Sequence, residues 1–223
     1  MATSTLIATV MNRILCKAAV ALVLAQGACA HATELTVQVN DSAGKPVADA
    51  IVYLESEAMA AAPKVIKHTA IEQRGLKFQP MVSVIQTGNT IGFPNNDKVK
   101  HHIYSFSPAK KFDQKLYSGD MAATQVFDKA GTVVLGCNIH DKMIAYIKVV
   151  DTPLFAKSDA AGAARIEVPA AGKYSVKLWH YNMSGAPSEQ ALVTKPGEAQ
   201  AAVAFKIAMK PPVPEAPASE PAY

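Results

Sequence analysis

The sequence predicts an all-β protein built from β-sandwiches, and three observations favour this fold class. Apolar and polar residues alternate along short segments, as in Leu35–Val39, which is typical of half-buried strands. Clusters of Gly, Pro, Asn and Asp separate these segments at close intervals. The chain beyond residue 33 carries no long run with the apolar period of a helix. Short strands at this spacing predict antiparallel sandwiches rather than a parallel βαβ fold.

The first 32 residues have the pattern of a cleaved secretory signal. Arg13 and Lys17 precede the apolar run 18–24. Residues 28–30 (Ala-Cys-Ala) offer a cleavage site of the small-x-small type. A start at Met11 would give a shorter signal of the same kind. The apolar run is shorter than the about 20 residues that a membrane-spanning helix needs. We therefore expect a periplasmic or secreted protein with no stable membrane span.

The predicted strands follow one another through the rest of the chain. They are expected at residues 35–39, 50–54, 81–86, 90–93, 102–106, 124–127, 132–136, 143–150, 165–168, 173–180 and 201–208. The segment 55–64 fits a helical turn or an alanine-rich loop equally well. Residues 211–223 contain five prolines and predict an extended, disordered tail.

Composition argues against several functions. The 223 residues include 22 Lys and Arg against 18 Asp and Glu, a formal net charge of +4, and no basic run exceeds Lys110-Lys111. A nucleic-acid partner is therefore not expected. The sequence also lacks a Gly-x-Ser-x-Gly elbow, a phosphate-binding loop and a His-Glu-x-x-His motif. We expect a protein that is not an enzyme.

One cysteine carries most of the information about function. Cleavage of the signal would remove Cys16 and Cys29 and leave Cys137 alone, which excludes an intramolecular disulfide. Cys137 begins the run Cys-Asn-Ile-His-Asp-Lys-Met, so a thiolate, the imidazole of His140 and the thioether of Met143 fall within seven residues. Thiolate, imidazole and a weak thioether are the donors that suit a blue-copper ion. The plainer alternative is that Cys137 and Met143 are ordinary core residues.

A trigonal copper site needs a second imidazole, and the adjacent pair His101 and His102 offers two candidates. Neighbouring side chains on a strand point to opposite faces, so only one of them can face the metal. The residues alone leave that choice open. Zinc would accept Cys and His, but the thioether argues against it.

These motifs resemble a known family. Cys-x-x-His-x-x-Met is similar to the short ligand loop of amicyanin-like cupredoxins, which are blue copper proteins, whereas the loops of the plastocyanin type are longer. Residues 91–103 (IGFPNNDKVKHHI) resemble the segment with the first histidine ligand, and the register from Phe93 places that ligand at His101. The resemblance implies a Greek-key cupredoxin sandwich with one copper per chain, cycling between Cu(I) and Cu(II). Its ligands would be His101, Cys137, His140 and Met143.

A second resemblance concerns domain organisation. Residues 35–54 resemble the opening of a carboxypeptidase-regulatory or transthyretin-like β-sandwich, and residues 155–180 resemble its closing half. The implied layout is a signal peptide (1–32), a first part of the regulatory-like sandwich (33–60), a cupredoxin-like copper domain (75–150), a second part (151–210) and the tail (211–223). The copper domain is thus expected to be inserted into, or followed by, the smaller sandwich.

The whole stretch from residue 34 to about 182 resembles exported proteins of the "methylamine utilization" type. Together these features predict a periplasmic mononuclear copper protein that transfers single electrons between exported redox proteins. The alternative is a non-catalytic copper-binding or sensing module, or a β-sandwich that binds carbohydrate or protein.

Overall fold

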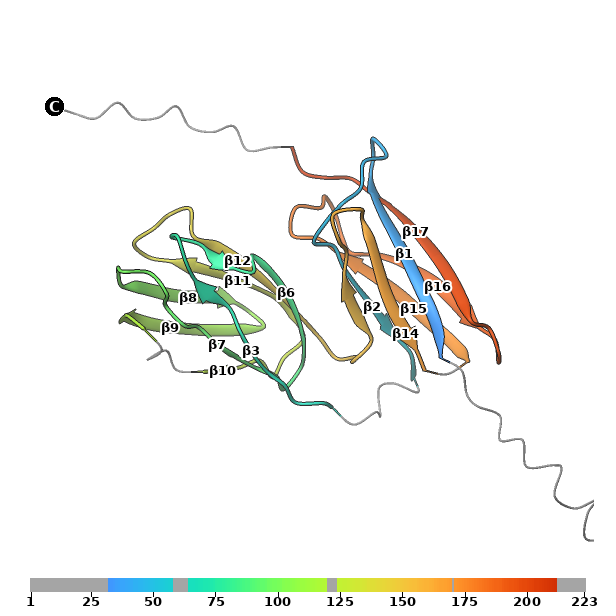
Figure 1. Ribbon diagram of the computed structural model, residues 1–223, viewed down its shortest axis with the longest axis horizontal. Coiled ribbons are helices and arrows are strands. Elements are labelled where there is room, and N and C mark those ends of the chain that lie inside the picture. The colour runs from blue at the N-terminus through green and yellow to red at the C-terminus, as the bar shows by residue number, and fades with distance from the viewer. Residues whose placement is uncertain (1–31, 58–63, 120–123, 170, 212–223) are drawn as a thin grey trace, which may run out of the picture. The chain divides into compact units, whose positions relative to one another are not determined.

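The computed structural model describes residues 32–57, 64–119, 124–169 and 171–211, and it shows an all-β protein, as the sequence predicts (Figure 1). Apart from Ala32 and Pro211, the expected signal peptide and proline-rich tail lie outside the described residues, as do residues 58–63 of the ambiguous segment. No helix in these described ranges has the length and apolar character needed to cross a membrane.

The strands are numbered in chain order. They are β1 (Thr33–Asp41), β2 (Ile51–Glu55), β3 (His68–Ala70), β4 (Glu72–Gln73), β5 (Phe78–Gln79), β6 (Val82–Gln86), β7 (Thr90–Gly92), β8 (His101–Ser107), β9 (Lys110–Tyr117), β10 (Gln125–Val126), β11 (Gly131–Cys137), β12 (Ile144–Val150), β13 (Phe155–Lys157), β14 (Ala163–Val168), β15 (Gly172–Trp179), β16 (Ser188–Thr194) and β17 (Gln200–Ile207).

The two ends of the described chain share one pair of sheets. β1 lies between β14 and β17, and β2 lies between β13 and β15, with β16 at the edge. β1 runs antiparallel to β14 and parallel to β17, so blue and red strands lie side by side in Figure 1. Alternation along β1 points Leu35, Val37 and Val39 inward with no exposed surface.

Apolar side chains from these two sheets form one cluster, here called the first core. Its members are Leu35, Val37, Val39, Val47, Ala50, Val52, Leu54, Ala164, Ile166, Val168, Tyr174, Val176, Leu178, Met183, Phe205 and Ile207. Because both sheets contribute, they pack face to face as a sandwich.

The middle of the chain forms its own sheets. A five-stranded sheet has the order β6-β12-β11-β8-β9, a three-stranded sheet has the order β10-β7-β3, and β4 pairs with β5. The buried cluster of these strands, here called the second core, contains Ile71, Phe78, Ile85, Ile91, Phe93, Ile103, Ala109, Tyr117, Phe127, Val133, Leu135, Cys137, Met143, Ala145, Ile147 and Val149. β3 and β4 begin before residue 75 and pair with β7 and β5 of this middle segment.

Every predicted strand is present, with ends that differ by at most two residues. Six further strands were not predicted: β3, β4, β5, β9, β13 and β16. Most of them are short, but β9 has eight residues, of which Lys110, Lys111, Asp113 and Lys115 are charged. β9 lies at an edge of the five-stranded sheet, where lysines discourage pairing with another chain. Its polar sequence therefore reflects its edge position.

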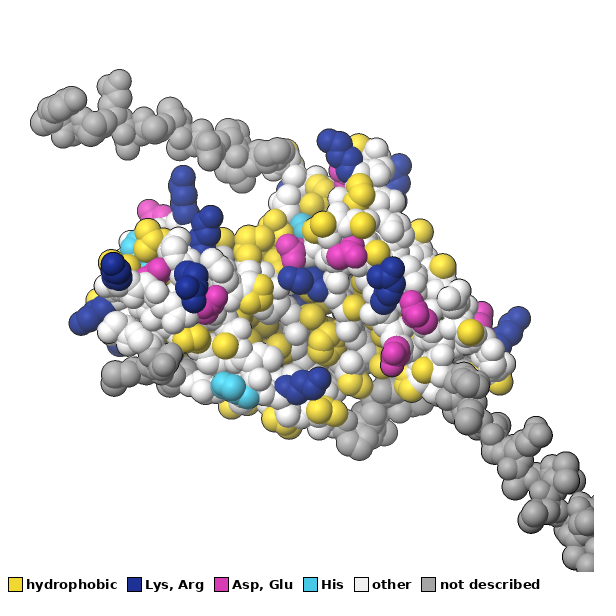
Figure 2. All heavy atoms as spheres, viewed as in Figure 1, with side chains coloured by type: hydrophobic (Ala, Val, Ile, Leu, Met, Phe, Trp, Pro, Cys, Tyr) yellow, Lys and Arg dark blue, Asp and Glu magenta, His cyan; other side chains and the backbone are white. Residues whose placement is uncertain are grey.

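The surface drawn in Figure 2 mixes charges of both signs. Dark blue Lys and Arg side chains lie among magenta Asp and Glu side chains, with apolar and neutral atoms between them. This face therefore carries no large patch of a single sign, in keeping with the small net charge of the sequence.

Candidate metal centre

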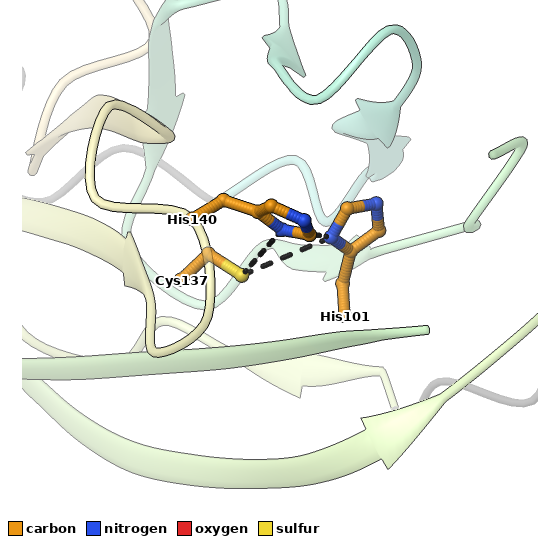
Figure 3. Close-up of side chains that lie close together, drawn as sticks. All are labelled: His101, Cys137 and His140. Carbon is orange, nitrogen blue, oxygen red and sulfur yellow. Dashed lines mark hydrogen bonds between the residues drawn. The ribbon is translucent and has the colours of Figure 1, made fainter. Parts of the chain in front are cut away.

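Three potential metal donors meet in the middle segment of the chain. Cys137 Sγ lies 3.8 Å from His101 Nδ1 and 3.6 Å from His140 Nδ1, and the two Nδ1 atoms are 3.2 Å apart. Figure 3 shows the three side chains turned toward one another. Among the described residues they form a group whose donor atoms all lie within 4.8 Å of one another.

Strand alternation positions two of these donors. In β8 the residues His101, Ile103 and Ser105 are buried, whereas the intervening side chains face outward. In β11 the inward residues end with Cys137, whose Cα is paired with that of Ile103 on β8. Neighbouring strands of one sheet thus direct an imidazole and a thiol to the same buried side. His101 has no exposed surface, and Cys137 is 5% exposed.

A tight loop supplies the third donor. The backbone N–H of Met143 donates to the carbonyl of His140 (2.9 Å), and the N–H of Cys137 donates to the carbonyl of Met143 (3.2 Å). Asn138 N–H also donates to the carbonyl of His102 (3.1 Å), which ties the loop to β8. These bonds bring His140 back over Cys137. His140 is half-buried and is the most exposed of the three donors.

Met143, the fourth residue expected at the site, is 1% exposed and belongs to the second core together with Cys137. Its backbone closes the loop that carries His140. The position of Met143 is therefore compatible with both roles that the sequence suggests, a weak axial donor and an ordinary core residue.

The histidine pair divides as strand alternation requires. His101 joins the thiol, whereas the neighbouring His102 projects from the other face of β8 and makes a hydrogen bond with the Asp113 carboxylate on β9. The structure thus brings His101, Cys137 and His140 together and leaves His102 outside the cluster. His101 is also the residue at which the register from Phe93 predicts the first histidine ligand.

A carboxylate absent from the sequence prediction supports His101. The Oδ2 atom of Asp97 lies 2.9 Å from His101 Nε2, the ring nitrogen that faces away from Cys137. Burial acts to raise the pKa of Asp97, but hydrogen bonds from His101 and from the backbone N–H groups of Leu76 and Gly75 outweigh it and lower the pKa below its ordinary value. Asp97 is therefore ionised at neutral pH and acts only as a hydrogen-bond acceptor.

A buried polar network lies behind this segment. The Gln73 carboxamide donates to the carbonyl of Phe93 (3.1 Å) and bonds the Tyr117 hydroxyl, which itself donates to the carbonyl of Phe93 (2.6 Å). Asn95 Nδ2 donates to the carbonyls of Val99 (2.8 Å) and Tyr117 (3.0 Å). These bonds fix the loop between β7 and β8, which carries Asp97 and leads into His101.

The network includes groups with unusual environments. Burial raises the pKa of Tyr117 to about 12, with the nearby Cys137 adding to the rise and the hydrogen bond to Gln73 opposing it. Gln73 Oε1 is buried with no hydrogen-bond partner among the described residues. Such groups are costly to bury, so their presence beside the donor cluster indicates a segment shaped for a task other than stability alone.

The donor set fits a transition-metal ion. His nitrogen and Cys sulfur bind an ion such as zinc at about 2.0–2.3 Å. Three such donors, spread evenly in one plane around the ion, lie about 3.5–3.8 Å from one another. The two sulfur–nitrogen distances match this spacing, and the nitrogen–nitrogen distance of 3.2 Å is slightly shorter. A thiolate with two imidazoles suits copper and zinc and is a poor set for magnesium or calcium.

Comparisons with known proteins give limited similarity. The sequence matches no known protein family and no curated protein. In structure, the chain is similar to a purple cupredoxin from Nitrosopumilus maritimus, with 21% identity and a TM-score of 0.34 over 37% of this chain and 99% of that one. It is also similar to amicyanin from Paracoccus versutus (Thiobacillus versutus), with 20% identity and a TM-score of 0.34 over 44% of this chain and 97% of that one.

Proposed function

We propose that His101, Cys137 and His140 bind one copper ion per chain and that the protein is a cupredoxin-like carrier of single electrons. The observation that supports this proposal is the convergence of one thiol and two imidazole nitrogens within 4.8 Å, at the buried end of a β-sheet. We assign Met143 as a weak fourth donor, on the basis of its place in the loop and its burial beside Cys137.

Bound copper supplies a one-electron couple between Cu(I) and Cu(II). The chain's own residues prepare the site for it. Cys137 must release its thiol proton to bind, and a neighbouring cation favours that loss. His101 and Cys137 project from paired strands, so their separation is fixed by the sheet. A rigid donor set limits rearrangement when the charge of the site changes.

His140 is the natural contact for electron exchange. It is the most exposed of the three donors and lies on a loop rather than within a strand. A redox partner that contacts this loop would lie close to the copper through the His140 imidazole, and the strands of the sheet would not need to move. Such encounters are transient and bury little surface. We propose exported redox proteins as the partners and the periplasm or the medium as the location, on the basis of the signal pattern in residues 1–32.

Voltammetry of the purified chain, loaded separately with copper and with zinc, tests this function. The copper form should give one reversible one-electron wave with an area equal to one electron per chain. The zinc form and a copper-treated Cys137→Ser variant serve as controls and should give none. Copper that binds tightly without a reversible wave would contradict electron transfer and favour a copper-binding or sensing module. Binding of zinc in preference to copper would contradict the metal assignment.

A further inference from the structure

The carboxylate of Asp97 has three hydrogen-bond partners that together fix its position. Its Oδ1 atom accepts from the backbone N–H of Gly75 (2.6 Å), and its Oδ2 atom accepts from that of Leu76 (3.1 Å) and faces His101 Nε2 (2.9 Å). The side chain is 13% exposed, and His101 has no exposed surface. The backbone N–H of Asp97 also donates to Asn95 Oδ1 (3.0 Å). The carboxylate therefore joins a turn more than 20 residues away to one imidazole of the donor cluster.

The turn that binds this carboxylate has an unusual backbone. Gly75 and Leu76 both have positive φ angles, of 62° and 57°, and the N–H of Arg74 donates to the carbonyl of Lys77 to close the turn (3.0 Å). A positive φ is uncommon for a residue such as leucine. Successive N–H groups that converge on one anion form a concave anion-binding site. The turn between β4 and β5 thus has the conformation that an ionised carboxylate at residue 97 would stabilise.

The bonding pattern of Asp97 determines the state of the imidazole. The carboxylate of Asp97 accepts from two backbone N–H groups and lies 2.9 Å from His101 Nε2, so an N–H at Nε2 completes the set of donors around it. In the neutral ring this leaves the lone pair on Nδ1, the atom that faces Cys137 Sγ at 3.8 Å. His101 is fully buried, and Asp97 is the carboxylate that faces its Nε2 atom.

We infer that Asp97, held by the turn at Gly75 and Leu76, is the positioning residue that fixes the orientation and tautomer of His101 before a metal binds. The part of this inference that concerns copper rests on the proposed function, whereas the part that concerns the imidazole does not. A carboxylate behind a histidine ligand orients the ring and makes it a better donor. Its negative charge also favours the more oxidised state of a bound redox ion.

The chain provides a matched control one residue away. His102 bonds the Asp113 carboxylate, so His101 and His102 each have an aspartate partner. The His102–Asp113 pair lies on the outward face of β8 and β9 and takes no part in the donor cluster. A variant without Asp113 therefore shows what the loss of an aspartate partner does to a histidine of β8 that lies outside the donor cluster. It should not affect the donor cluster itself.

The experiment compares wild type with Asp97→Ala, Asp97→Asn and Asp113→Ala. ¹⁵N NMR of the metal-free proteins reads the tautomer of His101, and copper affinity and reduction potential are measured afterwards. Wild type should show N–H at Nε2 of His101. Asp97→Ala should lose this preference, bind copper about 10- to 100-fold more weakly and have a higher potential. Asp97→Asn, which keeps the shape and one acceptor oxygen, should show the same changes to a smaller extent and remains informative if Asp97→Ala fails to fold.

Asp113→Ala should leave the His101 signals, copper affinity and potential at their wild-type values. The inference is overturned if both Asp97 variants keep the wild-type imidazole signals, or if Asp113→Ala causes losses equal to those of Asp97→Ala. A wild-type protein that binds no copper, but in which Asp97→Ala still changes the His101 tautomer, would disprove the proposed function and support the positioning role.

Discussion

The first and second cores are built from similar apolar residues but differ in how they use buried polar groups. In the sandwich around the first core, buried polar side chains bond backbone groups of other strands and loops of the same sandwich. Ser158, for example, donates to the carbonyl of Val47 (2.8 Å) and accepts from the N–H of Ala50 (2.9 Å). Around the second core, buried polar groups of Gln73, Tyr117 and Asn95 instead brace the loop that leads to His101.

This difference separates stability from function. A buried polar group that bonds backbone groups, as Ser158 does, compensates the cost of its own burial and joins two segments of the sandwich. Around the second core the bonded groups instead hold the loop that leads to His101, and replacement of both partners of such a bond by apolar groups of the same shape can be nearly neutral for stability. Natural folds depart from simple core rules chiefly at functional sites. The second core is therefore the part of the molecule where substitutions should change function and stability separately.

The largest expected effect comes from the histidine pair. His101→Ala removes a buried donor and leaves Asp97 without its partner, so the protein should lose copper on dialysis. His102→Ala removes a side chain that faces Asp113 and should keep about one copper per chain. Metal analysis of both dialysed variants checks this prediction. Retention of copper by His101→Ala together with loss by His102→Ala would show that the assigned register is wrong by one residue.

Equivalent leucines test the two cores directly. Leu54 in the first core and Leu135 in the second are both fully buried. Replacement of either by alanine should lower the free energy of unfolding by about 2–5 kcal/mol, as measured by denaturant titration. Only Leu135→Ala, two residues before Cys137 on the same strand, should also change the absorption spectrum of the copper form. An equal spectral change in Leu54→Ala would remove the distinction between the cores.

Met143→Leu should have a smaller effect on stability, because the two side chains are similar in size and such exchanges usually cost less than about 1.5 kcal/mol. If Met143 is a weak donor, its loss disfavours Cu(II) more than Cu(I) and raises the reduction potential. Voltammetry of the variant beside wild type measures this shift. An unchanged potential would assign Met143 to the core alone.

The smallest expected effect concerns pH and the first sandwich. Burial lowers the pKa of His180 below the ordinary value, with Asp49 and a backbone bond to Ala48 acting in the opposite direction. Below about pH 6.5 the imidazole of His180 is therefore protonated more readily in the unfolded chain than in the folded chain. The free energy of unfolding should fall as the pH drops from about 6.5 toward the lower pKa of the folded state.

The charged group that acts on the His180 pKa is Asp49, which also pairs with Lys157 at 2.7 Å. His180 Nδ1 also accepts from the N–H of Asn182 (3.1 Å), a bond that protonation would break. Denaturant titrations of metal-free wild type and His180→Gln at pH 7 and pH 5 check this account. The variant should lose less stability between the two pH values, and an identical loss in both proteins would count against it.

The sequence was informative wherever the signal was local. Strand alternation predicted the apolar strands around both cores, and the spacing from Cys137 to Met143 marked the loop that carries His140. Alternation also required that His101 and His102 point in opposite directions. Asp97 could not be recognised, because its role depends on a turn at Gly75 and Leu76 that is distant in sequence. β9 was missed for a related reason, since its charged residues suit an edge strand and give no apolar pattern.

The central claim is that His101, Cys137 and His140 form a single copper site, and titration of the metal-free protein with Cu(II) tests it most directly. Visible absorption should develop an intense thiolate-to-copper band that saturates at one equivalent per chain. Cys137→Ser should fold, because the substitution is small and buried within an intact sheet, yet it should show no such band. Absence of the band in wild type, or its persistence in Cys137→Ser, would contradict the claim.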